Sequence, residues 1–152
     1  MAFVATTATP AAAEVPVESL VRTNASFETG PMDREKACLT EAVFKEAGAE
    51  PVVGRMAVAH VILNRTRSGT FPKTVCGVIN QKGQFTYKHG GGIRRGAERQ
   101  WAEARAVATL ALSGVLSDVV KSALYFQSTR VRPSYSLRQV ARIGGHAFYV
   151  GR

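Results

Sequence analysis

Residues 41–51 read Glu41-Ala-Val-Phe-Lys-Glu46-Ala-Gly-Ala-Glu50-Pro51, and this stretch combines the end of an amphipathic helix with two carboxylates. Apolar side chains recur on one helical face at spacings of three and four residues, in the row Leu39, Val43 and Ala47. Gly48 weakens the helix, and Pro51 disfavours helical geometry for the residue before it. We therefore expect Glu46 in the last turn of this helix and Glu50 at its exit.

The expected position of Glu46 suits a general acid. Partial burial and the negative end of the helix dipole both disfavour its anion, so both raise its pKa. A carboxyl that stays protonated near neutral pH can give its proton to a leaving oxygen. The spacing also allows an ordinary surface glutamate paired with Lys36 or Lys45, and Glu50 could simply cap the next helix.

Length and charge limit the class of protein. A chain of 152 residues with 45% hydrophobic residues fits one domain with a proper core, and we expect a monomer. The 20 Lys and Arg against 11 Asp and Glu give a formal charge of +9, which favours a polyanionic partner such as nucleic acid, an anionic lipid surface or bacterial cell wall. No stretch approaches the roughly 18 apolar residues of a membrane span.

The first 31 residues are predicted to precede the folded domain. Residues 2–14 resemble the back half of a secretory signal, with an Ala11-Ala-Ala13 triplet but without the positive start, so a flexible tail is the alternative. Residues 14–31 are expected to be extended. We therefore predict a signal remnant or flexible lead-in over 1–31, a folded domain over 32–152, and export to the periplasm or cell wall.

The two cysteines bear on the same compartment. In an oxidising environment Cys38 and Cys76 could form a disulfide worth about 4 kcal/mol through loop closure, whereas in the cytosol they would be small buried thiols. The three histidines, His60, His89 and His146, do not have the close spacing of zinc ligands. We expect neither a metal nor another cofactor.

The rest of the chain predicts a mostly helical α+β domain with a small β element. We expect helices over 51–65 and 97–116, and a short helix or buried segment over 74–80. Strands are expected over 81–87, 123–127 and 143–150, and basic loops over 88–96 and 130–142. The two later strands are expected to pair with each other or with the first. The glycines of the first loop match neither a P-loop nor a dinucleotide fingerprint.

Several motifs in order resemble the SleB-type cell wall hydrolases, the spore-cortex-lytic family. They are Cys38-Leu-x-x-Ala-Val-Phe-x-Glu46-Ala-x-x-Glu50-Pro51, Gly54-x-x-Ala-Val-Ala-x-Val-Ile-Leu-Asn64-Arg65, Phe71-Pro-x-Thr-Val-Cys-Gly-Val-Ile79, Gln84-Phe-Thr, Ala123-Leu-Tyr-Phe126 and Ile143-Gly-x-His146-x-Phe148-Tyr149. The resemblance covers about residues 37 to 149. It implies a single lysozyme-like or lytic-transglycosylase-like catalytic domain over 32–152, acting on the glycan strands of peptidoglycan.

The resemblance also implies a reaction and its catalytic residue. One glutamate, here Glu46, protonates the oxygen that leaves N-acetylmuramic acid, and the muramic C6 hydroxyl closes onto C1 to leave a 1,6-anhydro sugar. A glycosidase that uses water needs two carboxylates, so Glu50 keeps lysozyme-type hydrolysis open as the alternative. Substrate-binding candidates at motif positions are Glu50, Asn64, Gln84, Thr86, Tyr125 and His146. Each could equally satisfy backbone groups inside the fold.

The chain departs from the family where Glu-Ala-Arg-Gly-Glu is usual. Gly48 and Ala49 replace the arginine and glycine, so a positive charge beside the acid is missing, which leaves the expected pKa of Glu46 higher if anything. Weaker activity, or an inactive relative that binds the wall, is therefore an open alternative.

Two other function classes are compatible with parts of the composition. A basic nucleic-acid-binding module would use Arg94, Arg95, Arg130, Arg132, Arg138 and Arg142, but no helix-turn-helix, RNP or zinc-finger pattern accompanies them, and we expect no nucleic acid partner. An amidase or peptidase would need a metal site or a nucleophile with its base, and the sequence pattern contains neither.

Overall fold

The computed structural model describes residues 16–27, 30–85, 91–133 and 136–151. Within these residues the chain forms five helices followed by three strands. The helices are α1 (Val17–Phe27), α2 (Arg34–Ala47), α3 (Val52–Arg67), α4 (Val75–Ile79) and α5 (Glu98–Leu112), and the strands are β1 (Tyr125–Ser128), β2 (Leu137–Ile143) and β3 (His146–Gly151). The mostly helical α+β class with a small β element, expected from the sequence, is confirmed.

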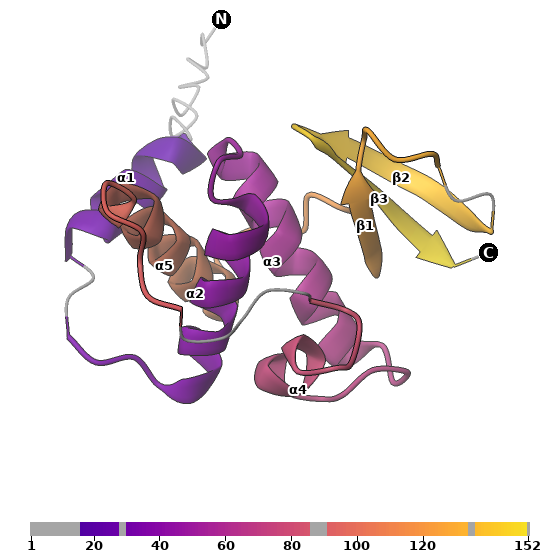
Figure 1. Ribbon diagram of the computed structural model, residues 1–152, viewed down its shortest axis with the longest axis horizontal. Helices are drawn as coiled ribbons and strands as arrows, with labels where there is room; N and C mark the ends of the chain where they lie inside the picture. Colours follow the sequence, from indigo (N-terminus) through magenta and orange to yellow (C-terminus); the bar gives the residue numbers. More distant parts are fainter. Residues whose placement is uncertain (1–15, 28–29, 86–90, 134–135, 152) are drawn as a thin grey trace, which may run out of the picture.

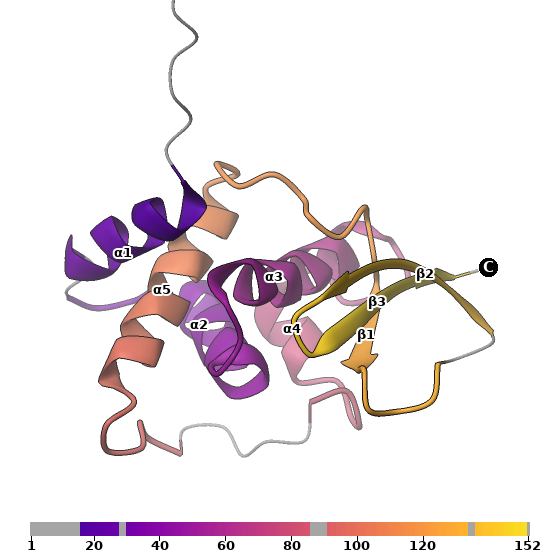
Figure 2. The same ribbon diagram turned by 90° about the horizontal axis from the view of Figure 1, so that it is seen from above.

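Helix α3 is the centre of the molecule. Helices α1, α2 and α5 lie on one side of it and the sheet lies on the other, as Figures 1 and 2 show from two directions. Most of its side chains are buried, including fully buried Val58 and Ile62 on the way from Val52 to Arg67. This agrees with the prediction of an enclosed core helix over 51–65.

Helix α2 begins and ends where local signals place it. The side chain of Asp33 accepts a hydrogen bond from the Lys36 N–H at 2.9 Å, which caps the start of the helix. The last helical residue is Ala47, and the N–H of Gly48 donates to the Phe44 carbonyl at 3.0 Å. Glu46 therefore lies in the last turn, as the sequence predicts.

The three strands form an antiparallel sheet in the order β1-β3-β2. Phe126 of β1 is paired with Phe148 of β3, and Phe148 is fully buried. Around Phe148 a second core cluster joins the sheet to α3 and to the segment before β1, through Ala57, Val61, Val120 and Ala123. Pairing of the two later strands with each other was one of the two expected arrangements and is confirmed.

Two predictions in the second half of the chain are wrong. Residues 81–85 form turns rather than the start of a strand, because Phe85 packs into the helical core instead of pairing with a sheet edge; residues 86 and 87 lie outside the described part. The expected basic loop over 130–142 contains β2, whose hairpin with β3 turns at Gly144 and Gly145. Because β2 is an edge strand with exposed arginines, its sequence lacks the apolar alternation by which a strand is predicted.

The predicted extended lead-in is also wrong over the residues that the structure describes. Helix α1 packs on α5, and its Val21 is completely buried in the main core. The amphipathic pattern of α1 is short, so its stability comes from this packing rather than from local signals. No helix in the described ranges is both long and apolar enough to cross a membrane.

A disulfide between Cys38 and Cys76 ties α2 to α4, with 5.4 Å between the two Cα atoms. Glu35 strengthens the same junction, since its carboxylate accepts a hydrogen bond from the Val75 N–H at 2.6 Å. The five-residue α4 is therefore held against α2 at its beginning.

Candidate active site

Glu46 occupies the position that its helical spacing predicts. It follows the fully buried Ala42 by one turn, and its own side chain is half-buried. This burial raises the pKa of Glu46 above its ordinary value of 4.5. Within the described residues its carboxyl makes no hydrogen bond or ion pair. The group therefore holds its proton to a higher pH, and neither of its oxygens is engaged by a residue that the structure describes.

Glu50 is engaged with the sheet. Its Oε2 accepts a hydrogen bond from the Gly145 N–H at 3.0 Å, and its Oε1 lies 3.8 Å from Nδ1 of His146. Gly144 has a φ of +55°, and a Cβ there would lie 2.0 Å from Oε2 of Glu50. A glycine is thus required for the close approach. Glu50 fastens the α2–α3 connection to the turn between β2 and β3.

His146 begins β3 directly after that turn. Its ring meets Phe126 edge-on, with 5.4 Å between the ring centroids. Its Nδ1 is buried and has no hydrogen-bond partner among the described residues. Glu50 and His146, both predicted as substrate-binding residues, therefore lie together at the junction of the helical part and the sheet.

Gln84 and Tyr125 come together around Arg65. The Arg65 side chain is buried, and its Nε donates to the Leu124 carbonyl at 2.7 Å. Its Nη1 donates to Oε1 of Gln84 at 3.2 Å, and its guanidinium lies 4.8 Å from the ring of Phe71 and 5.9 Å from that of Tyr125. Burial lowers the pKa of Arg65. Arg65 thus organises two candidates that the sequence placed far apart.

Asn64 is separate from this cluster. Its Nδ2 donates to the Ala123 carbonyl at 3.2 Å and to Asp118 at 3.1 Å. Of the two roles that the sequence left open for Asn64, these contacts favour satisfying polar groups within the fold. Thr86, the remaining candidate, lies outside the described residues.

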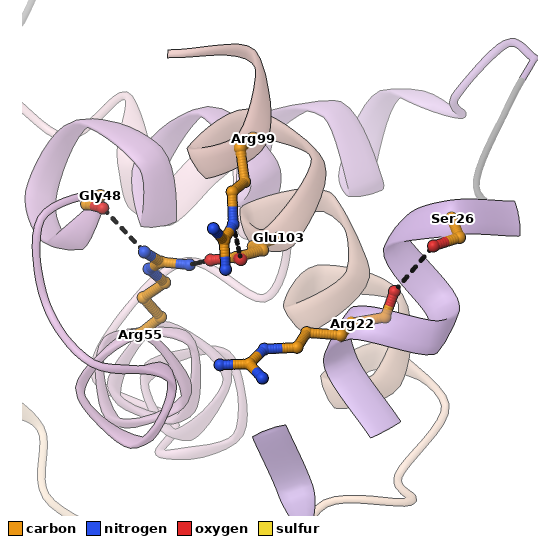
Figure 3. Close-up of polar contacts among 6 residues, drawn as sticks. All are labelled: Arg22, Ser26, Gly48, Arg55, Arg99 and Glu103. Carbon is orange, nitrogen blue, oxygen red and sulfur yellow. Dashed lines mark hydrogen bonds and ion pairs between the residues drawn. The ribbon is translucent and has the colours of Figure 1, made fainter. Parts of the chain in front are cut away.

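Sequence reasoning missed a buried ion-pair network behind the end of α2. Arg55 is 7% exposed, and its Nη2 donates to the Gly48 carbonyl at 2.9 Å. Its Nη1 pairs with Glu103, whose other carboxylate oxygen accepts from Nε of Arg99 at 3.0 Å. Figure 3 shows the Arg55 guanidinium between Gly48 and Glu103. A buried cation therefore holds the backbone two residues beyond Glu46.

This network bears on the departure at position 48. A Cβ on Gly48 would lie 2.4 Å from the Phe44 carbonyl oxygen, so this backbone leaves no room for a side chain there. Instead, Arg55, a residue of α3, donates a hydrogen bond from its guanidinium to the Gly48 carbonyl. A positive charge from α3 thus contacts the backbone at the end of α2, whereas the pKa of Glu46 is raised by burial alone.

The fold and the site together define a class of protein: a mostly helical domain with a small antiparallel sheet, whose Glu46 carboxyl lies half-buried at a helix end and has no partner among the residues that the structure describes. The family model described as Cell Wall Hydrolase matches residues 49–149. This chain therefore belongs to the cell wall hydrolase family, of the SleB type. Glu46 lies just before the matched range.

Known relatives agree with this assignment. The spore cortex-lytic enzymes of Halalkalibacterium halodurans and Bacillus subtilis are 35% and 34% identical, over 86% and 82% of this chain. This chain spans about two fifths of their length, 39% and 40%. The catalytic domain of the germination-specific lytic transglycosylase SleB from Bacillus anthracis aligns with a TM-score of 0.63 at 31% identity, over 80% of this chain and 98% of that domain.

Proposed function

We propose that this chain cleaves the glycan strands of peptidoglycan between N-acetylmuramic acid and N-acetylglucosamine, as a lytic transglycosylase with Glu46 as its general acid and base. The observation that carries the proposal is the state of Glu46: half-buried, with a raised pKa, and without a partner in the described part of the chain. Similarity to a solved catalytic domain described as a lytic transglycosylase supports the same reaction.

The proposed reaction uses one carboxyl twice. Protonated Glu46 gives its proton to the glycosidic oxygen, and the bond between this oxygen and C1 of the muramic sugar breaks. The C6 hydroxyl of the same sugar then bonds to C1, and its proton passes to the Glu46 carboxylate. The products are a 1,6-anhydro-muramic end and a free hydroxyl on the leaving sugar. No water is consumed, and the acid is regenerated.

The contacts of Glu50 favour this reaction over hydrolysis. A lysozyme-type enzyme needs a second carboxylate, as a nucleophile or to activate water. Glu50 follows Glu46 by four residues, just beyond the end of α2, and is the carboxylate nearest to it in the sequence. It accepts a hydrogen bond from Gly145 and lies beside His146. Its role as a structural clamp leaves Glu46 to act alone. Hydrolysis with Glu50 remains the alternative that the experiment must distinguish.

The experiment is mass spectrometry of purified peptidoglycan after digestion. We expect anhydro-muramic ends from the wild-type chain and no products from Glu46→Gln. Glu41→Gln, on the same helix but on another face, is the matched control and should keep the activity. Reducing ends would instead indicate hydrolysis, and released peptides without glycan cleavage would overturn both reactions.

We also propose that the chain works outside the cytoplasm, as the disulfide and the family suggest. Disulfides persist in oxidising compartments and are rare in the cytosol. Mass measurement of the protein isolated from its host, with and without reduction, tests this proposal. A fully reduced pool in the native protein would contradict it.

A further inference from the structure

The positive charge of the chain is concentrated in the sheet and its flanks. Residues 119–152 contain six Lys and Arg and no Asp or Glu, which gives +6, whereas residues 1–118 contain 14 Lys and Arg against 11 Asp and Glu, which gives +3. The segment of 34 residues thus carries two thirds of the formal charge of +9. Such a field attracts an anionic partner.

The described part of this segment contains four arginines that are exposed and form no ion pair with another described residue: Arg130, Arg132, Arg138 and Arg142. The nearest acid in the sequence is Asp118, whose carboxylate accepts hydrogen bonds from the N–H groups of Val120 and Ser122, both at 2.8 Å. Asp118 therefore serves the turn before β1, and the sheet arginines that the structure describes keep their charge available to a partner.

Two of these arginines lie at the end of the sheet that is fastened to the acid-bearing segment. The Thr129 N–H donates to the Gly145 carbonyl at 2.8 Å, and the Gly145 N–H donates to Glu50. Arg130 follows Thr129 directly, and Arg142 lies two residues before the β2–β3 turn. Figures 1 and 2 show this turn beside the start of α3. Glu50 in turn follows Glu46 by four residues.

The chemistry of the substrate indicates what these cations would meet. The sugars of a glycan strand have no net charge where the muramic carboxyl is joined to a stem peptide, so the strand itself offers no counter-ion. The stem peptides carry free carboxylates and project from the strand beside the bond that is cleaved. A guanidinium binds a carboxylate through two parallel hydrogen bonds, which suits this partner better than an ammonium would.

We propose that Arg130 and Arg142 bind the carboxylates of stem peptides, so that the protein selects glycan strands whose peptides carry free carboxylates over strands whose peptide carboxylates are amidated. This inference rests on the proposed function, since it assigns a substrate preference to the same site. Exposed charge pairs are individually weak, and two of them together correspond to about a tenfold preference in affinity. The preference should weaken with added salt.

The test compares two substrates: purified peptidoglycan, and the same material after its peptide carboxylates have been converted to amides with a carbodiimide and ammonia. Binding is measured in a Glu46→Gln background, so that the strands stay intact. We expect about tenfold tighter binding to the strands with free carboxylates, and we expect Arg130→Gln with Arg142→Gln to reduce this ratio towards one. The control, Arg67→Gln with Lys73→Gln, removes the same charge from exposed positions of the helical part and should keep the ratio.

The outcomes are distinguishable from those of the proposed function. Equal binding to both substrates by the parent protein, or an equal effect of the control pair, would overturn the role of the two arginines. Loss of binding to both substrates in the arginine variant would show that the sheet binds the glycan itself, which also overturns the inference. Product analysis of the amidated strands with active protein tests the cleavage reaction separately, because these strands still contain the scissile bond.

Discussion

Replacing Arg55 with methionine should destabilise the protein strongly at neutral pH. Arg55 and Glu103 have side chains that are 8% and 10% exposed, so the substitution leaves a buried carboxylate without its buried partner. Removing one member of such a pair costs about 3–5 kcal/mol. Arg99 keeps one hydrogen bond to Glu103, although its own side chain is 76% exposed, so we expect about 3 kcal/mol. For a chain of this length that is a decrease in Tm of about 6–12 °C.

The destabilisation caused by Arg55→Met should depend on pH. Burial pushes the pKa of Glu103 up, but hydrogen bonds from Arg55 and Arg99 outweigh it and hold the pKa below its ordinary value of 4.5. The stabilisation is therefore present above that value and is lost as pH falls through the lower pKa of the folded state. Urea unfolding of the wild type and the variant should show a large difference at pH 7. The difference should shrink as the pH falls below 4.5, because protonation of Glu103 removes the buried charge.

Two control variants separate the ion pair from simple loss of packing. Arg99→Gln removes only the exposed partner and should cost less than about 1 kcal/mol. Arg55→Met combined with Glu103→Leu removes both buried charges and should recover much of the loss, because an apolar pair of similar volume no longer contains an unpaired charge. A cost below about 1 kcal/mol for Arg55→Met at pH 7, or a double variant as unstable as the sum of its parts, would refute the reasoning.

Three further outcomes follow from the described contacts. Glu46→Gln should raise the free energy of unfolding at pH 7, because burial raises the pKa of Glu46 and its charge therefore destabilises the folded state. Urea unfolding should show that this gain vanishes below about pH 4.5, and an equal gain at both pH values would contradict the prediction. Gly144→Ala should lower the Tm more than Gly69→Ala, since both glycines have positive φ but only the first has an atom of Glu50 in the way; equal losses would argue against the clamp. Reducing the disulfide between α2 and α4 should lower the free energy of unfolding by about 4 kcal/mol in urea titrations. No change would show that the loop between Cys38 and Cys76 is already restrained in the unfolded chain.

The helices and the position of Glu46 are predictable because their causes are local. A spacing of three and four residues, a glycine and a proline are enough to place the acid in the last turn of α2. Helix α1 does carry this spacing, in Val17, Leu20, Val21 and Ala25, and all four pack on the core; the turn-forming residues around them outweighed this spacing in the prediction of an extended segment. Strand β2 has no such signal, because it is defined by pairing with β3 while its arginines face solvent. In β2 tertiary contacts determine the structure, and no short pattern records them.

The roles of Glu50 and Arg55 could not be predicted for a related reason. The partner of Glu50 is a backbone N–H 95 residues away, and that of Arg55 is a carboxylate 48 residues away. A backbone donor leaves no trace in the sequence except the paired glycines at 144 and 145 that let it approach. Considered alone, Glu50 is a second carboxylate available for hydrolysis. Once the hairpin turn is bound to it, the same residue stabilises the junction with the sheet. This engagement favours the proposed reaction, in which the substrate supplies its own nucleophile and Glu46 is the single acid.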